Sequence, residues 1–228
     1  MISVITMCYD RQHFLDVTLP RWLTIPKDIE YEVVVCHGPN IELPDDPKIK
    51  SVLIDGPQMN RAYNKGIYAS KYDTLLFTQS DIIIHDPHQI KRMADMHMPS
   101  LVVTDRIVKY GVRDPGIYMY MTMVSKDKVL EVGGWPECYD GGDTYAFEDA
   151  DLMASLLKNG MYLKIVQSPD ALAANHIDHL RPDYNSQELI DRLAAGRKLY
   201  KSRHPVGIEA LFAKQMARNM MTAKYRVL

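Results

Sequence analysis

The sequence has only three cysteines among 228 residues, and no two of them form a CxxC pair. A sparse, odd set of this kind argues against a disulfide framework or a zinc cluster, so Cys8, Cys36 and Cys138 are expected to be reduced, mostly buried thiols. No apolar run approaches the roughly 18 residues that a membrane-spanning helix needs, and no basic segment opens the chain. We therefore expect a cytoplasmic protein with no transmembrane segment.

An excess of charge of either sign is also missing. The 27 Lys and Arg residues nearly balance the 29 Asp and Glu residues, and the net charge is −2. A nucleic-acid backbone is therefore not an expected partner. The GxxxxGK[ST] pattern of P-loop proteins and the GxGxxG pattern of dinucleotide enzymes are both absent, which argues against a hydride-transfer enzyme. The length favours one compact domain.

What the chain does have is an alternation of short apolar runs with helical stretches. Runs rich in β-branched residues predict strands over residues 2–6, 31–36, 51–54 and 74–77, and helical spacing of apolar residues predicts helices over 14–22 and 59–69. This βαβαβ order predicts an α/β fold in which helices flank a mostly parallel central sheet. Ligands of such sheets bind at the carboxyl ends of the strands.

The second half of the chain has a more mixed pattern. It contains an apolar run over 101–104, a short helix near 126–132, glycine-rich turns at 133–134 and 141–142, a helix over 147–158 and a strand over 161–166. Two helical stretches, separated at His204-Pro205, follow from Ser186 onward. We predict a domain over 1–185, with halves 1–85 and 86–185, and a C-terminal helical extension over 186–228 that packs on it. The extension is the expected contact surface for any homo-oligomer.

Two groups of carboxylates are candidates for chemistry. Asp81 follows the apolar strand over 74–77 and can ligate a hard divalent cation such as Mg²⁺ or Mn²⁺; an ordinary turn aspartate is an equally weighted alternative. Glu148, Asp149 and Asp151 stand at a predicted helix start, where acidic residues also serve simply as helix-dipole partners. The glycine-rich loop before them favours a functional interpretation, in which one carboxylate is a general base.

Two further sets are candidate ligand contacts. His176 and His179 can complete a metal shell with Asp81, although such a histidine pair is more often structural. Arg61 and Lys65 lie four residues apart near a helix start behind Gly56-Pro57. A helix N-terminus with two cations beside it is a natural site for a diphosphate.

Taken in order, these segments resemble the family 2 inverting glycosyltransferases of the GT-A fold, over roughly residues 2–180. The segments that carry the resemblance are Ile2 to Arg11 for the opening strand and turn, Ala62 to Ile67 for the "ARNxGI" helix, Leu75 to Asp81 for the strand ending in Asp-x-Asp, Val132 to Glu137 for the "GGFDE" loop, and Phe147 to Leu152 for "GEDxDL". The resemblance implies transfer of a sugar, hexosyltransferase-like, from a UDP- or GDP-linked donor. A glycan, a lipid-linked sugar or another hydroxyl compound is the implied acceptor.

The resemblance also assigns roles to individual residues. Asp149 falls on the general base, and Glu148 lies beside it for the acceptor or donor sugar. Asp81 falls on the second Asp of Asp-x-Asp, which implies Mn²⁺ or Mg²⁺ and diphosphate binding, and the late metal-binding histidine falls on His176 or His179. The implied nucleoside and donor contacts are Asp10, Asp55, Arg61, Lys65 and Gln79.

Two residues depart from the family pattern. Gln79 replaces the first Asp of Asp-x-Asp, which removes a charge from the metal region and relaxes the expected dependence on a cation. Phe147 replaces the glycine before Glu148, and its bulk is expected to narrow the acceptor site. A nucleotidyltransferase and a non-catalytic sugar-nucleotide or glycan-binding module remain the alternatives, the first lacking its usual glycine-rich opening loop.

Overall fold

The computed structural model describes residues 1–8, 12–105, 108–109, 112–113, 119, 121–144, 146–166, 174–176, 186–207, 210–211 and 213. A central seven-stranded sheet has the order β10-β6-β9-β4-β1-β2-β3, and a smaller four-stranded sheet has the order β5-β11-β7-β8. The strands of the central sheet are β1 (Ile2–Cys8), β2 (Tyr31–His37), β3 (Ile49–Leu53), β4 (Thr74–Phe77), β6 (Leu101–Asp105), β9 (Thr122–Ser125) and β10 (Tyr162–Val166). Those of the small sheet are β5 (Ile82–Ile84), β7 (Val108–Lys109), β8 (Val112–Arg113) and β11 (Ala174–His176).

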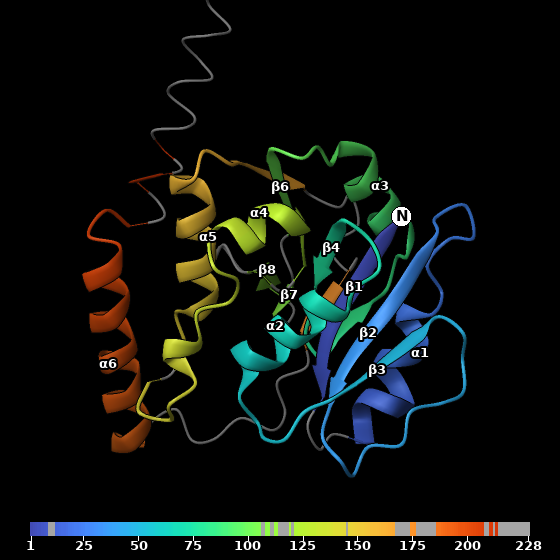
Figure 1. The fold of residues 1–228 in the computed structure, drawn as a ribbon, viewed down its shortest axis with the longest axis horizontal. Coiled ribbons are helices and arrows are strands. Elements are labelled where there is room, and N and C mark those ends of the chain that lie inside the picture. Colours follow the sequence, from blue (N-terminus) through green and yellow to red (C-terminus); the bar gives the residue numbers. More distant parts are fainter. Residues whose placement is uncertain are drawn as a thin grey trace, which may run out of the picture.

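Helices cover both faces of the central sheet (Figure 1). They are α1 (Leu19–Trp22), preceded by a π-helical turn over Phe14–Thr18, α2 (Met59–Ala69), α3 (His88–Met96), α4 (Lys126–Glu131), α5 (Glu148–Lys158) and α6 (Gln187–Arg203), with a 3-10 turn over Glu137–Tyr139. The predicted α/β class and its mostly parallel sheet are therefore confirmed. So are the helices predicted over 59–69 and 147–158, within one residue at each end.

The first half of the chain builds the parallel part of the sheet. β1 lies between β2 and β4 and is parallel to both, and β3 adds to β2 in the same direction. β4 has the predicted bounds, β1 and β2 end two residues and one residue later than predicted, and β3 begins two residues and ends one residue earlier. β9 then runs antiparallel between β4 and β6. The carboxyl ends of β1, β2, β3 and β4 thus share one edge, where a ligand of an open α/β sheet is expected.

Successive residues of the central strands point into two separate hydrophobic cores. In β1, Val4 packs in the core beneath α1 and α3, whereas Ile5 packs in the core beneath α2, α4 and α5. Val33 and Val34 of β2 divide in the same way. Burial on both faces explains why these strands are apolar at nearly every position.

Gly66 lets α2 lie close against the sheet. A Cβ atom at this position would lie 2.7 Å from Cγ2 of Ile5 and 2.9 Å from Sγ of Cys36, closer than normal packing allows. Cys36 and Cys8 are buried free thiols, as predicted, whereas Cys138 is exposed. The close approach of α2 sets the height of its first turns above the carboxyl edge of the sheet.

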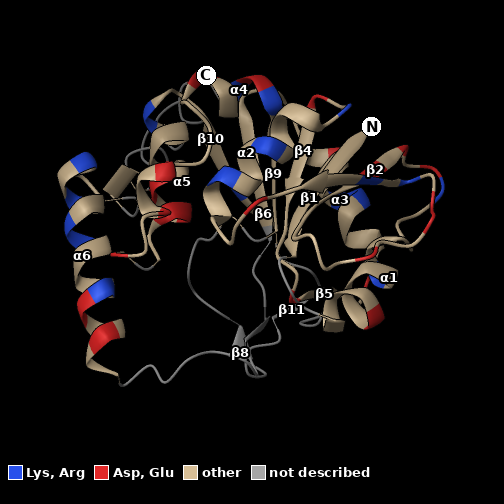
Figure 2. Cartoon of the chain, turned by 60° about the horizontal axis from the view of Figure 1, so that its bottom comes forward, with Lys and Arg blue, Asp and Glu red and all other residues tan. Residues whose placement is uncertain are grey.

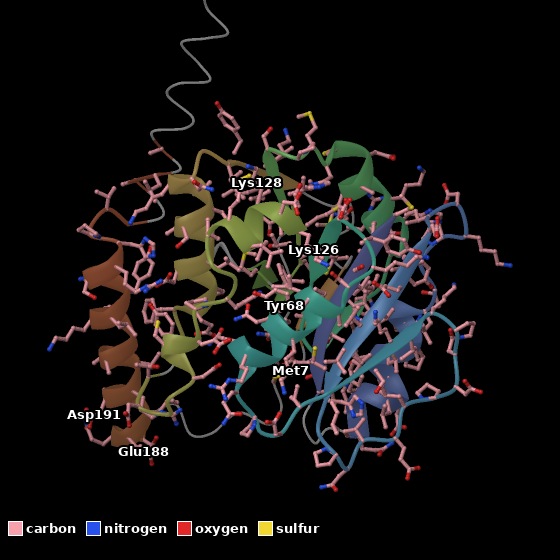
Figure 3. All side chains as sticks on the ribbon, viewed as in Figure 1. Met7, Tyr68, Lys126, Lys128, Glu188 and Asp191 are labelled. Atoms are coloured by element: carbon pink, nitrogen blue, oxygen red, sulfur yellow. The ribbon has the colours of Figure 1, made fainter. Side chains whose placement is uncertain are left out.

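α6 packs beside α5 at one side of the molecule (Figure 1). The hydroxyl of Ser186 accepts a hydrogen bond from the backbone N–H of Leu189 at 3.3 Å, and the helix ends at Arg203, just before the predicted break at His204-Pro205. Glu188 and Asp191 lie near its N-terminal end (Figure 3), and basic residues follow toward its C-terminal end (Figure 2). The second predicted stretch lies mostly outside the described residues. No helix in the described part of the chain is long and apolar enough to cross a membrane.

Candidate active site

Asp149 lies in the first turn of α5 with its side chain almost completely buried, at 6% exposure. Its Oδ1 accepts a hydrogen bond from the backbone N–H of Ala150 at 2.7 Å, and its Oδ2 has no hydrogen-bond partner among the described residues. Burial raises the pKa of Asp149 to about 6, and hydrogen bonds from backbone N–H groups oppose the rise. A carboxylate in this state is a stronger base than an exposed aspartate.

The backbone before Asp149 is strained. Ala146 and Phe147 have φ angles of 62° and 77°, in the left-handed region that side chains other than glycine rarely adopt. Phe147 stands where the family motif has glycine, so this conformation explains the motif. We expected the Phe147 ring to narrow the acceptor site. The ring packs on α6, stacked against Tyr200 with ring centroids 5.8 Å apart, and its effect on an acceptor site stays a prediction.

Three of the predicted acidic residues lie near the side chain of Tyr63. Its hydroxyl donates a hydrogen bond of 2.7 Å to the carbonyl of Thr78, just past the end of β4. Burial, and then the negative charges of nearby groups, Asp81, Glu148 and Asp149 among them, raise the pKa of Tyr63 well above its usual value. All three carboxylates, which lie up to 68 positions apart in the chain (149 − 81), are therefore near enough to the Tyr63 hydroxyl to affect its ionisation. Asp81 itself is buried, at 8% exposure.

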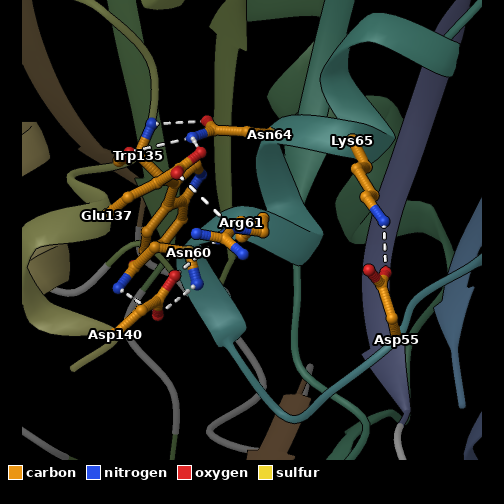
Figure 4. Close-up of polar contacts among 8 residues, drawn as sticks. All are labelled: Asp55, Asn60, Arg61, Asn64, Lys65, Trp135, Glu137 and Asp140. Carbon is orange, nitrogen blue, oxygen red and sulfur yellow. Dashed lines mark hydrogen bonds and ion pairs between the residues drawn. The ribbon is translucent and has the colours of Figure 1, made fainter. Parts of the chain in front are cut away.

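The N-terminus of α2, predicted to bind a diphosphate, receives a carboxylate from the chain itself (Figure 4). Oδ1 of Asp140 accepts hydrogen bonds from the backbone N–H and the side-chain amide of Asn60, at 3.0 and 2.9 Å. Oδ2 of Asp140 accepts one from the backbone N–H of Arg61 at 2.8 Å. In this structure an internal anion thus occupies the predicted anion site.

Arg61 and Lys65 pair with different carboxylates rather than facing one anion together (Figure 4). Nε of Arg61 lies 3.6 Å from Oε2 of Glu137, and Nζ of Lys65 lies 2.6 Å from Oδ1 of Asp55. The hydrogen bond from Lys65 lowers the pKa of Asp55, whose side chain is largely exposed. Exposed pairs of this kind contribute little to stability, so a phosphate can replace either carboxylate at low cost. Roles for Asp55, Arg61 and Lys65 in donor binding remain predictions.

Asn64 joins α2 to the glycine-rich loop of the second half, a role that sequence reasoning missed. Its side chain accepts a hydrogen bond from the N–H of Trp135 at 2.8 Å and donates to the carbonyl of Trp135 at 3.0 Å (Figure 4). The Trp135 ring stacks on Tyr63, with centroids 4.5 Å apart, and meets Phe77 edge-on at 5.3 Å. We call the contacts of Asn64 with Trp135 the Asn64 clamp. Asn64 lies in the "ARNxGI" segment and Trp135 in the "GGFDE" segment, and this membership is the sequence signal that could have pointed to their contact.

We expect Gly134→Ala to disrupt the Asn64 clamp. A Cβ atom at Gly134 would lie 2.5 Å from Oδ1 of Asn64, and the φ angle of 77° already disfavours alanine. Gly133→Ala is the matched control, because Gly133 has a φ angle of 91° but nothing within 4 Å of its Cβ position. Thermal unfolding should show Gly134→Ala to be less stable than the control by about 1–3 kcal/mol. Equal melting temperatures for the two variants would contradict the clamp.

Asp151 forms a second connection that sequence reasoning missed. Its side chain is 1% exposed and accepts hydrogen bonds from Nε of Arg203 at 2.6 Å and from the Tyr139 hydroxyl at 3.0 Å. Nε2 of His204 lies 3.0 Å from its other oxygen. These polar contacts more than offset the effect of burial and hold the pKa of Asp151 below its usual value. Helix α5 is thereby joined to the end of α6.

The predicted metal ligands are only partly described. No group of three His, Cys, Asp or Glu side chains suited to a cation occurs among the described residues. The backbone pairing of β11 with β5 sets His176 opposite Ile82, next to Asp81, but the His176 side chain is not among those described. His179 and Asp10 lie outside the described residues. The described side chains therefore do not by themselves make a metal site, and ligation by Asp81 with a histidine remains a prediction.

Comparison with known proteins finds the fold in solved structures. No family model and no curated protein sequence matches the chain. A structure of S. aureus TarS (1–349) in complex with UDP-GlcNAc matches 96% of this chain and 72% of its own, with a TM-score of 0.67 and 14% identity. The mannosyltransferase PcManGT from Pyrobaculum calidifontis, in complex with GDP-Man and Mn²⁺, matches 100% of this chain and 80% of its own, with a TM-score of 0.61 and 12% identity.

A further S. aureus TarS structure matches 91% of this chain at a TM-score of 0.61 and 14% identity, and the chain spans 40% of its length. At sequence identities this low, the structural similarity shows a shared fold alone. The chain has the GT-A glycosyltransferase fold, as its motifs predicted.

Proposed function

We propose that this protein is an inverting glycosyltransferase, which moves a sugar from a nucleoside-diphosphate sugar to a hydroxyl acceptor with Asp149 as general base. The observation that carries the proposal is the buried Asp149 carboxylate, with a pKa raised to about 6, at the start of α5. Asp81 and Glu148 lie around the same tyrosine, Tyr63, near the carboxyl edge of the sheet. The solved GT-A structures bound to UDP-GlcNAc and GDP-Man support a nucleotide-sugar donor.

The proposed reaction is one displacement. Asp149 takes the proton of the acceptor hydroxyl as that oxygen attacks the anomeric carbon, and the bond between this carbon and the diphosphate oxygen breaks. The leaving diphosphate keeps the electron pair of that bond. Since a single attack takes place from the face opposite the leaving group, the configuration at the anomeric carbon inverts. At pH 7–8 a base with a pKa of about 6 is ionised and still holds a proton better than an ordinary aspartate does.

The donor is expected at the carboxyl edge of β1 to β4. There Gln79 offers a neutral amide to a ribose hydroxyl, and Lys65 and Arg61 can exchange their exposed carboxylate partners for phosphate oxygens. Asp81, with His176 or His179, is the expected ligand set for Mn²⁺ or Mg²⁺. Such a cation would supply charge neutralisation of the departing diphosphate.

A sugar-nucleotide screen tests the proposal. Thermal shifts with UDP, GDP and their sugar conjugates, with and without Mn²⁺, identify the donor, and incubation with hydroxyl acceptors then follows product release. We expect release of nucleoside diphosphate together with a glycosylated acceptor of inverted configuration. Release of pyrophosphate would indicate a nucleotidyltransferase. Donor binding with no turnover on any acceptor would indicate a binding module and overturn the enzymatic proposal.

The turnover rate is expected to fall on the acid side of a midpoint near pH 6. The pKa of Asp149 is raised to about 6, so protonation removes the base as the pH drops through that value. Turnover with saturating donor should be measured between pH 5 and pH 8, with circular dichroism as the control for folding. A rate that stays constant across this range in folded protein would contradict the role of Asp149.

A further inference from the structure

Helix α6 contacts the segment before and within the first turn of α5 at three successive points. Nη2 of Arg192 donates to the carbonyl of Thr144 at 3.4 Å. The ring of Tyr200 stacks on Phe147, and the Arg203 guanidinium pairs with Asp151. The order of contacts along α6 follows the order along the segment. α6 therefore supports Thr144 and the stretch from residue 146 to residue 151, in which Glu148 and Asp149 lie.

This stretch needs support from outside, because its backbone is strained at two adjacent residues. Ala146 and Phe147 both have left-handed φ angles, and Phe147 starts α5 without a side-chain cap. Strained conformations of this kind persist only where the surrounding contacts hold them. The stacking of Phe147 on Tyr200, with the Arg197 guanidinium 5.9 Å from the Phe147 ring centroid, supplies one such contact.

The contact at Asp151 is the strongest of the three. The side chain of Asp151 accepts from both Nε and Nη2 of Arg203, at 2.6 and 3.2 Å, and Nε2 of His204 lies 3.0 Å from Oδ1. A bidentate pair of this kind restricts rotation as well as translation of the helix that carries it. The backbone N–H of Asp151 also donates to the carbonyl of Phe147 at 2.8 Å. The ion pair and the strained residue thus belong to one helical turn, and Asp149 lies within that turn.

We propose that the Asp151–Arg203 pair, completed by His204, positions the Asp149 carboxylate for proton abstraction, so that α6 is a working part of the active site. This inference rests on the proposed role of Asp149 as base. Asp151 and Arg203 touch neither substrate in this scheme and act as positioning residues. A shift of about 1 Å in a catalytic group can lower a rate on the order of 100-fold, so a small rotation of this turn is sufficient to matter.

The test compares Arg203→Gln, which removes the guanidinium, with Arg203→Lys, which keeps the charge. Lys201→Gln, an exposed position on the same helix, is the matched control. We expect Arg203→Gln to lower kcat about 10-fold or more with the donor KM changed less than about twofold, Arg203→Lys to recover part of the loss, and Lys201→Gln to behave as wild type. Assays are run well below each melting temperature.

An Arg203→Gln variant that melts earlier but keeps wild-type kcat would overturn the inference, because the pair would then serve stability alone. Should Arg203→Gln not fold, Arg203→Lys carries the test with the same kinetic readouts, since it keeps the charge but loses the two-point contact with Asp151; wild-type kcat in Arg203→Lys would then overturn the inference. Asp149→Asn is measured in parallel. Full turnover by Asp149→Asn would overturn the proposed function, whereas an inactive Asp149→Asn with an unaffected Arg203→Gln would overturn only the positioning role.

Discussion

The variant Asp149→Asn is expected to lose sugar transfer and yet to melt at a higher temperature than the wild type at pH 8. Loss of a general base lowers turnover about 10²–10⁴-fold, and donor binding should change less than about twofold, because the donor contacts lie on other residues. Turnover of a nucleotide sugar, calorimetric titration of the donor and thermal unfolding give the three measurements. The substitution keeps the size of the side chain and removes only the ionisable group.

The expected gain in stability follows from the sign of the pKa shift. Burial raises the pKa of Asp149 from 3.8 to about 6, so the folded state binds this proton more tightly than the unfolded state does. The ionised carboxylate therefore opposes folding above about pH 6, and an amide removes that cost, worth about 1–2 kcal/mol after the amide's own burial is counted. The advantage should disappear as the pH falls below 4, where the wild-type carboxyl is protonated in both states.

Asp73→Asn, at an exposed aspartate before β4, controls for the general effect of removing one negative charge. It should change neither turnover nor melting temperature. An Asp149→Asn variant that transfers sugar at the wild-type rate, or that is less stable than the wild type at pH 8, would contradict the assignment of Asp149 as a buried base.

Trp135→Ala is expected to have the largest effect on stability. Trp135 is 3% exposed and its ring contacts those of both Tyr63 and Phe77, so its removal empties a large space in the core beneath α2. Truncation of a buried tryptophan to alanine costs about 3–5 kcal/mol. Thermal or urea unfolding measures this loss, which corresponds to a fall in Tm of roughly 6–20 °C for a chain of this size.

Tyr68→Ala is the matched control for an aromatic truncation. Tyr68 lies on α2, close in sequence to Tyr63, but its side chain is 73% exposed (Figure 3). Its removal should change stability by less than about 0.5 kcal/mol. If both variants were equally stable, the aromatic cluster would not be part of the core that supports the site.

The strands of the central sheet and the helices on its two faces could be predicted from the sequence, because the apolar pattern of each element is a local property. Residues 74–77 and 59–69 have the predicted bounds for this reason. Strand-end reasoning and motif order grouped Asp81 with Glu148 and Asp149, and in the structure all three act on the ionisation of Tyr63. Their joint role in a site remains a prediction.

The pairings between distant residues were beyond sequence reasoning. Asp140 meets the N-terminus of α2 across 80 positions, and nothing local to either segment marks a carboxylate as the ligand. Asp151 was one of three candidate carboxylates and Arg203 an unremarked charge on a predicted helix, and nothing in the sequence indicated that the two side chains pair. His204 was noted only as part of a helix break. Each of these contacts depends on tertiary geometry that periodicity does not encode.

The Asn64 clamp has a consequence for recombination between chains of this fold. α2 belongs to the predicted nucleotide-sugar half, and the loop it holds belongs to the predicted acceptor half, yet Asn64, Gly134 and Trp135 must fit one another within a few tenths of an ångström. A chimera that exchanges one half at residue 85 would pair an α2 from one parent with a loop from the other. New donor or acceptor specificities are therefore better grafted with residues 59–66 and 133–140 transferred as one unit.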